Sequence, residues 1–294
     1  MKTHLLTLAI AGSIACYSQE DTLSVLSSNA DTVRVHVEPY HNPMLRAGAV
    51  TSGGVKAYSY IDGFVDGLDI WGEKGKDIET LSHLLTDSFN TDGEKVRAIF
   101  YWMTQNIDYD VKKYHNRKCV PFRCYCKSKH GRNKKEHRDC IEKWEWELAR
   151  EALIKRKGVC SDYAFLFYYL CDFAEIECRY ITGFASSLTT DGRMLTPTMS
   201  EKASNHAWNA VMIEGEWHLL DVTWASGYCD KGVNKFTREL SEDYYLTPPE
   251  EMIFNHHPKD KEWQLLDRPL KMKEFVELVN KRQRANFVCS RSAK

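Results

Sequence analysis

The stretch GVCSDYAFLFYYLCDFA, residues 158–174, decides the fold. From Val159 to Ala174 nearly every position is apolar or aromatic. A helix that is apolar on all sides lies in the core of a protein, so this segment predicts a central buried helix. Cys160 then lies on the first turn of that helix, a position that favours the reactive thiolate form of a cysteine. The alternative is that Cys160 is simply a small core residue.

A β-hairpin farther along the chain is expected to bring a histidine and an aspartate together. Its first strand, its turn and its second strand are 206–213, Glu214-Gly215 and 216–223. A two-residue turn places His206 opposite Thr223. Alternate residues of a strand share a face, so His206 and Asp221 are predicted to be diagonal neighbours on one face. A three-residue turn would separate them, and the prediction therefore depends on this turn.

Cys160, His206 and Asp221 are the parts of a nucleophilic site for amide or ester bonds. In such a site the thiolate attacks a carbonyl carbon, the imidazole protonates the departing amine, and the carboxylate holds the imidazole in the correct tautomer. The backbone N–H of Cys160 is the expected first donor to the oxyanion.

Four more residues are candidates for substrate binding. Trp102 and Gln105, on a preceding helix, are candidates for the second oxyanion donor, with a scaffold role as the alternative. Trp208 and Trp224 flank the predicted triad, and they either wall a substrate groove or pack in the core.

Helices and strands are expected around these motifs. Apolar residues at helical spacing predict a helix from Asp77, and a capping box of Thr91 and Glu94 begins a second one. A third helix is expected at 141–157, a strand at 178–184 and a final helix from Lys273.

Several of these segments resemble one family. The matching segments are 158–164 (GVCSDYA), 205–209 (NHAWN), 217–224 (WHLLDVTW), 94–110 (EKVRAIFYWMTQNIDYD) and 257–275 (HPKDKEWQLLDRPLKMKEF). Together they resemble the transglutaminase-like branch of papain-type thiol enzymes, nearest to the kyphoscoliosis-peptidase-like group of bacterial exported proteins, over roughly residues 77–280. The resemblance implies an α+β fold with a papain/transglutaminase-like core, in which a central nucleophile-bearing helix packs on an antiparallel β-sheet. It also implies Cys160, His206 and Asp221 as the triad.

The sequence departs from that family at two places. Asp162 stands where relatives usually carry Gly, directly after the position of Ser161, and the segment 112–143 is longer than expected. The carboxylate of Asp162 is expected either to favour the helix N-terminus or to disfavour the nearby thiolate, and the sequence leaves both open.

The N-terminal residues 1–19 have the pattern of an export signal. Lys2 precedes an apolar run that is too short to span a bilayer. Ser13-Ile14-Ala15-Cys16 resembles a lipoprotein cleavage box, so Cys16 is a candidate lipid anchor, and ordinary cleavage near Ser18 is the alternative. We expect an exported protein, periplasmic or at the cell surface, without a transmembrane helix in the mature chain.

Cysteine content agrees with export, because the chain has 10 cysteines and disulfides form in oxidising compartments. The segment 112–143 contains His115, Cys119, Cys124, Cys126, His130, His137 and Cys140. Disulfides, free thiols and zinc remain open for this segment, and its spacing is poor for zinc. Cys171 and Cys178 are expected to be buried thiols. No metal and no cofactor are assigned.

The domains predicted from the sequence are a signal at 1–19, an extended arm at 20–76, a catalytic domain at 77–280 with the insertion 112–143, and a tail at 281–294. With 40 basic and 41 acidic residues, the net charge of -1 does not favour nucleic acid as a partner. A cysteine protease or amidase acting on a peptide, a protein or cell-wall peptide is the first hypothesis. Glutamine acyl transfer by a transglutaminase and a catalytically silent peptide-binding module are the alternatives.

Overall fold

The computed structural model describes residues 58–70, 72, 74–116, 134–186, 200 and 204–281, together with short strands at 24–26 and 32–34. The chain divides into two compact units. The larger comprises Tyr58–Thr182 and Asn205–Thr247, and the smaller comprises Met1–Ala57, Gly183–Ser204 and Pro248–Lys294. The predicted signal peptide lies outside the described residues, as does most of the predicted tail.

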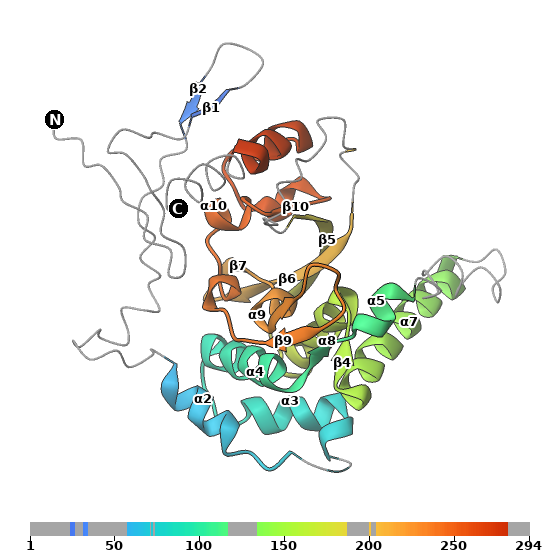
Figure 1. The fold of residues 1–294 in the computed structure, drawn as a ribbon. Coiled ribbons are helices and arrows are strands. Elements are labelled where there is room, and N and C mark those ends of the chain that lie inside the picture. The colour runs from blue at the N-terminus through green and yellow to red at the C-terminus, as the bar shows by residue number, and fades with distance from the viewer. Residues whose placement is uncertain are drawn as a thin grey trace, which may run out of the picture. The chain divides into compact units, whose positions relative to one another are not determined.

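The larger unit is a mixture of helices and short strands, as the α+β prediction required (Figure 1). In chain order its elements are α2 (Ser59–Asp66), η1 (Lys74–Lys76), α3 (Ile78–Thr86), α4 (Asp92–Asn106), β3 (Asp108–Tyr109), α5 (Val111–His115), α7 (Lys134–Lys155), β4 (Lys157–Gly158), α8 (Cys160–Phe173), β5 (Cys178–Ala185, whose last three residues fall in the smaller unit), β6 (His206–Ile213), β7 (Glu216–Leu220), α9 (Val222–Ala225), β8 (Gly227–Cys229), β9 (Phe236–Arg238) and η2 (Glu242–Tyr244).

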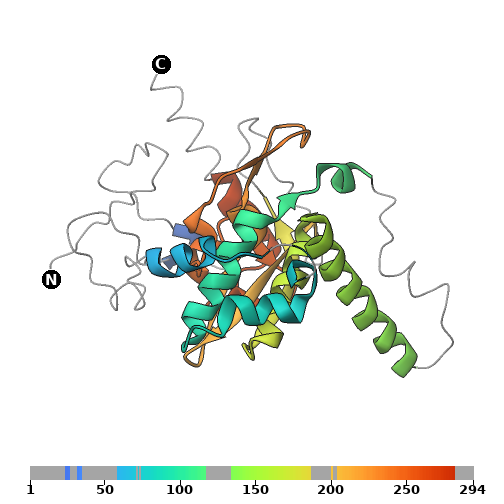
Figure 2. The ribbon, with the colours of Figure 1, turned by 90° about the horizontal axis from the view of Figure 1, so that it is seen from below.

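Helix α8 is the centre of the larger unit, as its sequence predicts. Leu166, Phe167 and Leu170 are fully buried, and the helix contacts α3, α4, α7, α9 and β6. Helix α7 runs along one side of α8 as a long rod (Figure 2). The prediction that the helix beginning at Cys160 packs against a sheet is therefore confirmed.

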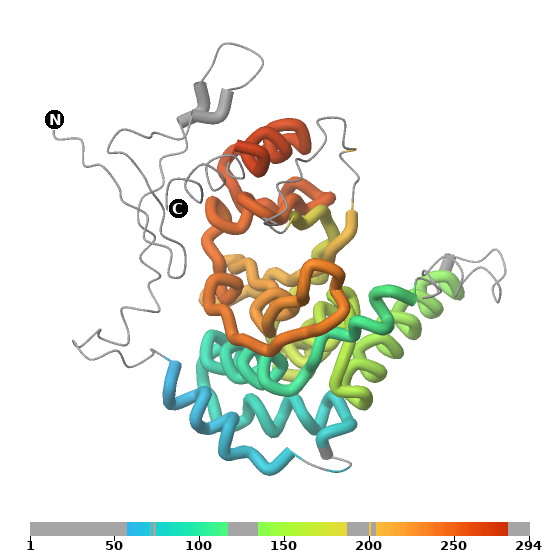
Figure 3. The backbone as a smooth tube through the Cα atoms, in the orientation of Figure 1, coloured from blue at the N-terminus to red at the C-terminus, as the bar shows by residue number. Residues whose placement is uncertain are grey.

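The hairpin β6–β7 has the predicted two-residue turn. Glu214 and Gly215 both have positive φ, 52° and 85°, and Ile213 pairs with Glu216. These backbone angles match the right-handed twist of a tight hairpin and fix the register. The tube in Figure 3 follows the chain through this hairpin, which lies in a sheet of order β5-β6-β7 within the larger unit.

The end of the second strand differs from the prediction. Strand β7 stops at Leu220, and α9 begins at Val222, so His206 does not pair with Thr223. The reason is local, because the carboxylate of Asp221 accepts hydrogen bonds from the N–H groups of Thr223 and Trp224. An aspartate that bonds to the following amides starts a helix and ends the strand.

Helices α3 and α4 form where their patterns predict them, and Thr91 and Glu94 make the predicted capping box. Helix α7 begins at Lys134, well before the predicted start at 141. Residues 135–139 are exposed and strongly polar, so this first turn has helix-forming residues but no apolar period by which to detect it.

Helix α2 corrects the expectation of an extended arm over 20–76. It belongs to the larger unit, where Asp62 accepts two hydrogen bonds of 2.8 Å from the guanidinium of Arg97 on α4. Arg97 is fully buried and also bonds to Glu242 at 2.6 and 2.8 Å. Its guanidinium lies 4.9 Å from the ring centre of Tyr245. This ion pair joins residues far apart in the chain, so no local pattern signals it.

The smaller unit has its own apolar cluster. Its described elements are the end of β5, α10 (Pro249–Met252), β10 (His256–Pro258), η3 (Lys261–Gln264), a helix at 272–281, and the paired strands β1 (Ser24–Leu26) and β2 (Thr32–Arg34). Strand β10 pairs antiparallel with Gly183–Ala185. Met272, Phe275, Val276 and Val279 form the fully buried part of its cluster. Among the helices that the structure describes, none is both long and apolar enough to cross a membrane.

Candidate active site

Cys160 is the first residue of α8, and its thiol is free and partly exposed. The carbonyl of Val159 accepts hydrogen bonds from the N–H groups of Asp162 and Tyr163, so the helix starts at Cys160. The first N–H groups of a helix have no partner within the helix, and they carry its positive end. The N–H of Cys160 is therefore a donor without a partner inside the helix, and its thiol lies at the positive end of the helix.

The backbone before Cys160 is held by a short parallel ladder. Strand β4 pairs with β3, with Tyr109 opposite Gly158. The N–H of Asp110 donates to the carbonyl of Gly158 at 2.8 Å. The ladder fixes the segment that leads into the nucleophile.

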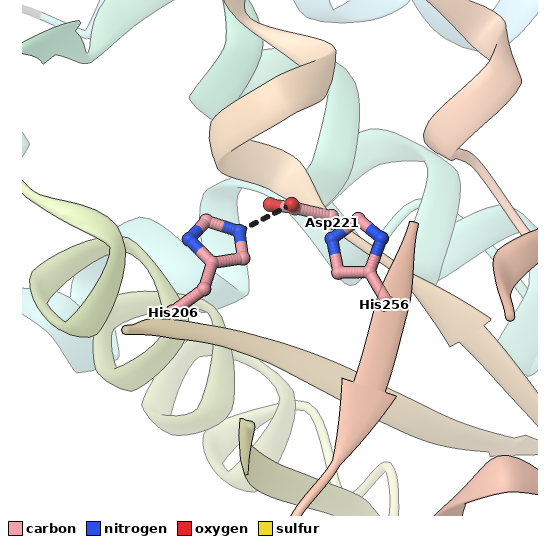
Figure 4. A group of neighbouring side chains, drawn as sticks. All are labelled: His206, Asp221 and His256. Carbon is pink, nitrogen blue, oxygen red and sulfur yellow. Dashed lines mark hydrogen bonds and ion pairs between the residues drawn. The ribbon is translucent and has the colours of Figure 1, made fainter. Parts of the chain in front are cut away.

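His206, at the start of β6, bonds to Asp221, which follows β7. Its Nε2 lies 2.6 Å from Oδ2 of Asp221, as the dashed line in Figure 4 shows. Asp221 is fully buried, and its Oδ1 accepts from the N–H groups of Thr223 and Trp224 at 2.9 and 3.1 Å. These bonds fix the carboxylate and leave Nδ1 of His206 as the ring nitrogen for another partner. His256, also drawn, belongs to the smaller unit.

Electrostatics link His206 to both other members of the predicted triad. Burial opposes the charged form of the ring, but the charges of Asp221 and Cys160 and hydrogen bonds to both side chains raise the pKa of His206 to about 10. An imidazole with this pKa carries its proton at neutral pH and stabilises a thiolate beside it. His206 and Asp221 therefore meet as the sequence predicts, and the charge of Cys160 acts on the same imidazole.

Comparison with known proteins agrees with this geometry. Residues 79–222 match the family described as the transglutaminase-like superfamily, and the match includes all three residues. This segment is a transglutaminase-like domain. The chain is 32% identical to the human kyphoscoliosis peptidase over 197 residues, which cover 67% of this chain and 25% of that protein. The chain thus spans about a quarter of the length of this relative.

The similarity of this chain to solved structures is low. A candidate cysteine protease from Cytophaga hutchinsonii has a TM-score of 0.30 and 21% identity, covering 54% of this chain and 44% of that one. A structure named as a TGase has a TM-score of 0.32 and 13% identity, covering 69% of this chain and 41% of that one.

Two tryptophans of the larger unit lie near the ring of His206. The ring of Trp224, which is half-buried, lies 5.2 Å from the imidazole, and the buried ring of Trp208 lies 6.1 Å from it. The ring of Tyr244 meets that of Trp224 edge-on, with the ring centres 5.4 Å apart. Both tryptophans therefore pack near the imidazole, and their role in substrate binding stays a prediction.

The other two candidate binding residues have scaffold contacts. Trp102 is buried, and the guanidinium of Arg156 lies 4.7 Å from its ring. Gln105 donates a hydrogen bond of 3.3 Å to Thr104. Neither contact reaches Cys160, so their role as oxyanion donors stays a prediction.

The sequence did not point to two tyrosines that lie near the thiol of Cys160. Burial, and after it the charge of Cys160, raises the pKa of Tyr109 and that of Tyr180. Tyr109 is brought there by the pairing of β3 with β4, and Tyr180 stacks on Phe165 of α8 at 4.0 Å. Tyr109 lies in a family-like segment of the sequence, but only the two-residue ladder shows that this segment approaches Cys160.

Some of the other cysteines and histidines that the sequence singles out lie within the described residues. Cys171 and Cys178 are buried free thiols, as predicted. Cys229 is a free and partly exposed thiol on β8. His115 makes a bond of 2.8 Å with the carbonyl of Val233. Four other members of the predicted cysteine- and histidine-rich group lie outside the described residues: Cys119, Cys124, Cys126 and His130.

Proposed function

We propose that this domain is a cysteine hydrolase that cleaves amide bonds of peptides, proteins or cell-envelope material through Cys160, His206 and Asp221. One observation carries the proposal: a buried His206 is bonded to Asp221 and coupled to a thiol at the start of a core helix. A thiolate with an imidazolium partner and a fixed carboxylate is the arrangement that covalent acyl chemistry needs.

The reaction has two halves. The sulfur of Cys160 attacks the carbonyl carbon and forms a C–S bond, and the resulting oxyanion accepts a hydrogen bond from the N–H of Cys160. When the C–N bond breaks, His206 gives its proton to the departing amine, which leaves a thioester. Water then gives a proton to His206 and attacks the thioester, and the acid leaves while the thiolate is restored.

Transfer to a second amine uses the same thioester, because an amine competes with water for it. The two reactions are distinguished by their products. Hydrolysis releases free acid, whereas transfer joins a labelled primary amine to a glutamine-containing acyl donor. Release of acid in excess over amine incorporation is the expected result.

We also propose that the protein is exported. The signal-like residues 1–19 support this, and so does Cys140 on α7, which is disulfide-bonded. Disulfides persist in oxidising compartments. Mass spectrometry of the mature protein would locate its N-terminus, and a mature chain that still begins at Met1 would contradict export.

An acyl-transfer probe tests the catalytic proposal. An activated ester such as p-nitrophenyl acetate should acylate Cys160, and the variant Cys160→Ala should lose the modification while keeping its fold. Cys229→Ala is the matched control, because Cys229 is also a free, partly exposed thiol. Undiminished acylation of Cys160→Ala would disprove the nucleophile assignment. Peptide binding by a parent chain that never forms a thioester would instead support the silent binding module.

A further inference from the structure

Asp162 is an acidic residue in the protein core, two residues after Cys160. It is fully buried on the first turn of α8. Acidic residues are almost never fully buried unless they are paired. The sequence also singles out this position, because the family resemblance implies Gly where Asp162 stands.

The Oδ2 atom of Asp162 joins three segments. It accepts a hydrogen bond of 2.9 Å from the N–H of Val159, directly before the nucleophile. It also lies 2.7 Å from Nζ of Lys113, whose side chain is only 17% exposed. Nζ of Lys113 lies 3.5 Å from Glu151 on α7. One carboxylate thus ties the start of α8 to α5, and through Lys113 to α7.

Backbone geometry around the nucleophile depends on the same carboxylate. A Cβ atom added to Gly158 would lie 2.7 Å from Cβ of Asp162 and 3.0 Å from its Oδ2. Only glycine leaves room for Asp162 at this distance. The carbonyl of Gly158 accepts from the N–H of Asp110, and the side chain of Asp110 in turn accepts from the N–H of Lys113 at 2.9 Å. Both ends of the ion pair are therefore attached to the loop that leads into Cys160.

We propose that Asp162 and Lys113 act as positioning residues, which together fix the backbone at 158–160 so that the Cys160 N–H is aimed at the oxyanion. The pair also anchors the beginning of the insertion 112–143 against the nucleophile helix. This inference rests on the proposed function, since it concerns the geometry in which Cys160 accepts an acyl group. Between the two possibilities left open by the sequence, the contacts of Asp162 favour a role at the helix N-terminus.

The charge balance explains why both partners are needed. Burial raises the pKa of Asp162, and the ammonium of Lys113 opposes that rise. Without Lys113, the buried carboxyl group would lose its ion pair and keep the hydrogen bond from the N–H of Val159. A buried charge that loses its partner forces its surroundings to rearrange or takes up a proton. Either response shifts the loop that carries Cys160.

Two chemical probes separate positioning from simple stability. Acylation by p-nitrophenyl acetate requires the thiolate and the oxyanion donor, whereas alkylation by iodoacetamide requires the thiolate alone. Displacement of a reacting group by about 1 Å costs about a hundredfold in rate. We therefore expect Lys113→Met and Asp162→Asn to acylate about a hundredfold more slowly, while their alkylation rates stay within about threefold of the parent.

Matched variants complete the test. Lys113→Arg retains the charge and should restore most of the acylation rate. Lys155→Met is the control, because Lys155 also pairs with Glu151 but is exposed and does not reach Asp162. If Asp162→Asn does not fold, the comparison of Lys113→Met with Lys113→Arg and Lys155→Met decides the question, since Lys113 lies on the short helix α5.

The outcomes distinguish this inference from the proposed function. Acylation and alkylation that fall in parallel, or acylation of Lys113→Met at the parental rate, would overturn the positioning role and leave the function intact. A parent chain whose Cys160 is never acylated would overturn both.

Discussion

Replacing Asp221 with Asn tests the bond that holds the imidazole of His206. This bond is 2.6 Å long, and the two side chains are 8% and 0% exposed, so solvent screens it little. A hydrogen bond to a charged group contributes about 1.5–3 kcal/mol, and one pKa unit corresponds to about 1.36 kcal/mol. The pKa of His206 in Asp221→Asn should therefore fall by about 1 to 2 units.

The rate at which Cys160 is acylated should fall by more than the lower pKa of His206 alone requires. The lost stabilisation of the imidazolium corresponds to about a 10- to 150-fold lower rate. The new amide also donates to Nε2, which moves the ring proton to Nδ1 when the imidazole is neutral. That is the wrong tautomer for accepting a proton from the thiol, and the loss then approaches about 10⁴-fold.

The fold should tolerate this replacement. The oxygen of Asn can still accept from the N–H groups of Thr223 and Trp224, so α9 keeps its cap. In Asp221→Ala the cap is lost, and the free energy of unfolding should fall by a further ~1 kcal/mol. The measurements are NMR titration of His206, acylation of Cys160 and urea unfolding. A folded Asp221→Asn in which both the pKa of His206 and the acylation rate equal those of the parent would refute this account of the triad.

Three further predictions concern stability and pH. Arg97→Met should lower the free energy of unfolding by about 3–5 kcal/mol, because it leaves the carboxylate of Asp62 buried without its bidentate partner; urea unfolding at the parental midpoint would contradict this. Gly215→Ala should cost about 1–2 kcal/mol, because φ is 85° there and no atom lies within 4 Å to clash, so the loss is backbone strain alone. A much larger loss of unfolding free energy in urea would contradict this, because it would require a steric clash at Gly215 as well as backbone strain. The pKa of His206 is raised from 6.5 to about 10. The stability that protonated His206 adds to the folded state is therefore fully present below pH 6.5 and is lost as the pH rises through 10. Urea unfolding between these pH values should show stability falling less steeply in Cys160→Ala than in the parent, and identical slopes would exclude a Cys160 contribution.

Interactions between residues close together in the chain made much of the fold predictable from the sequence. The apolar run of α8, the capping box of Thr91 and Glu94, and the two-residue turn at Glu214-Gly215 act over a few residues and form as predicted. The turn sets the register of the hairpin, and this local signal was sufficient to predict that His206 and Asp221 meet. The strand period did not place Asp221, because β7 ends at Leu220 and Asp221 caps α9.

Contacts between distant segments were decided only by the tertiary structure. Arg97 binds Asp62 and Glu242, which lie 35 and 145 residues away in the chain, and this pairing makes α2 part of the larger unit rather than of an extended arm. Asp162 was conspicuous in the sequence, but its partner Lys113 was not. An ion pair forms wherever folding brings opposite charges together in a buried place, and a charged residue has no periodic pattern that identifies its partner in advance.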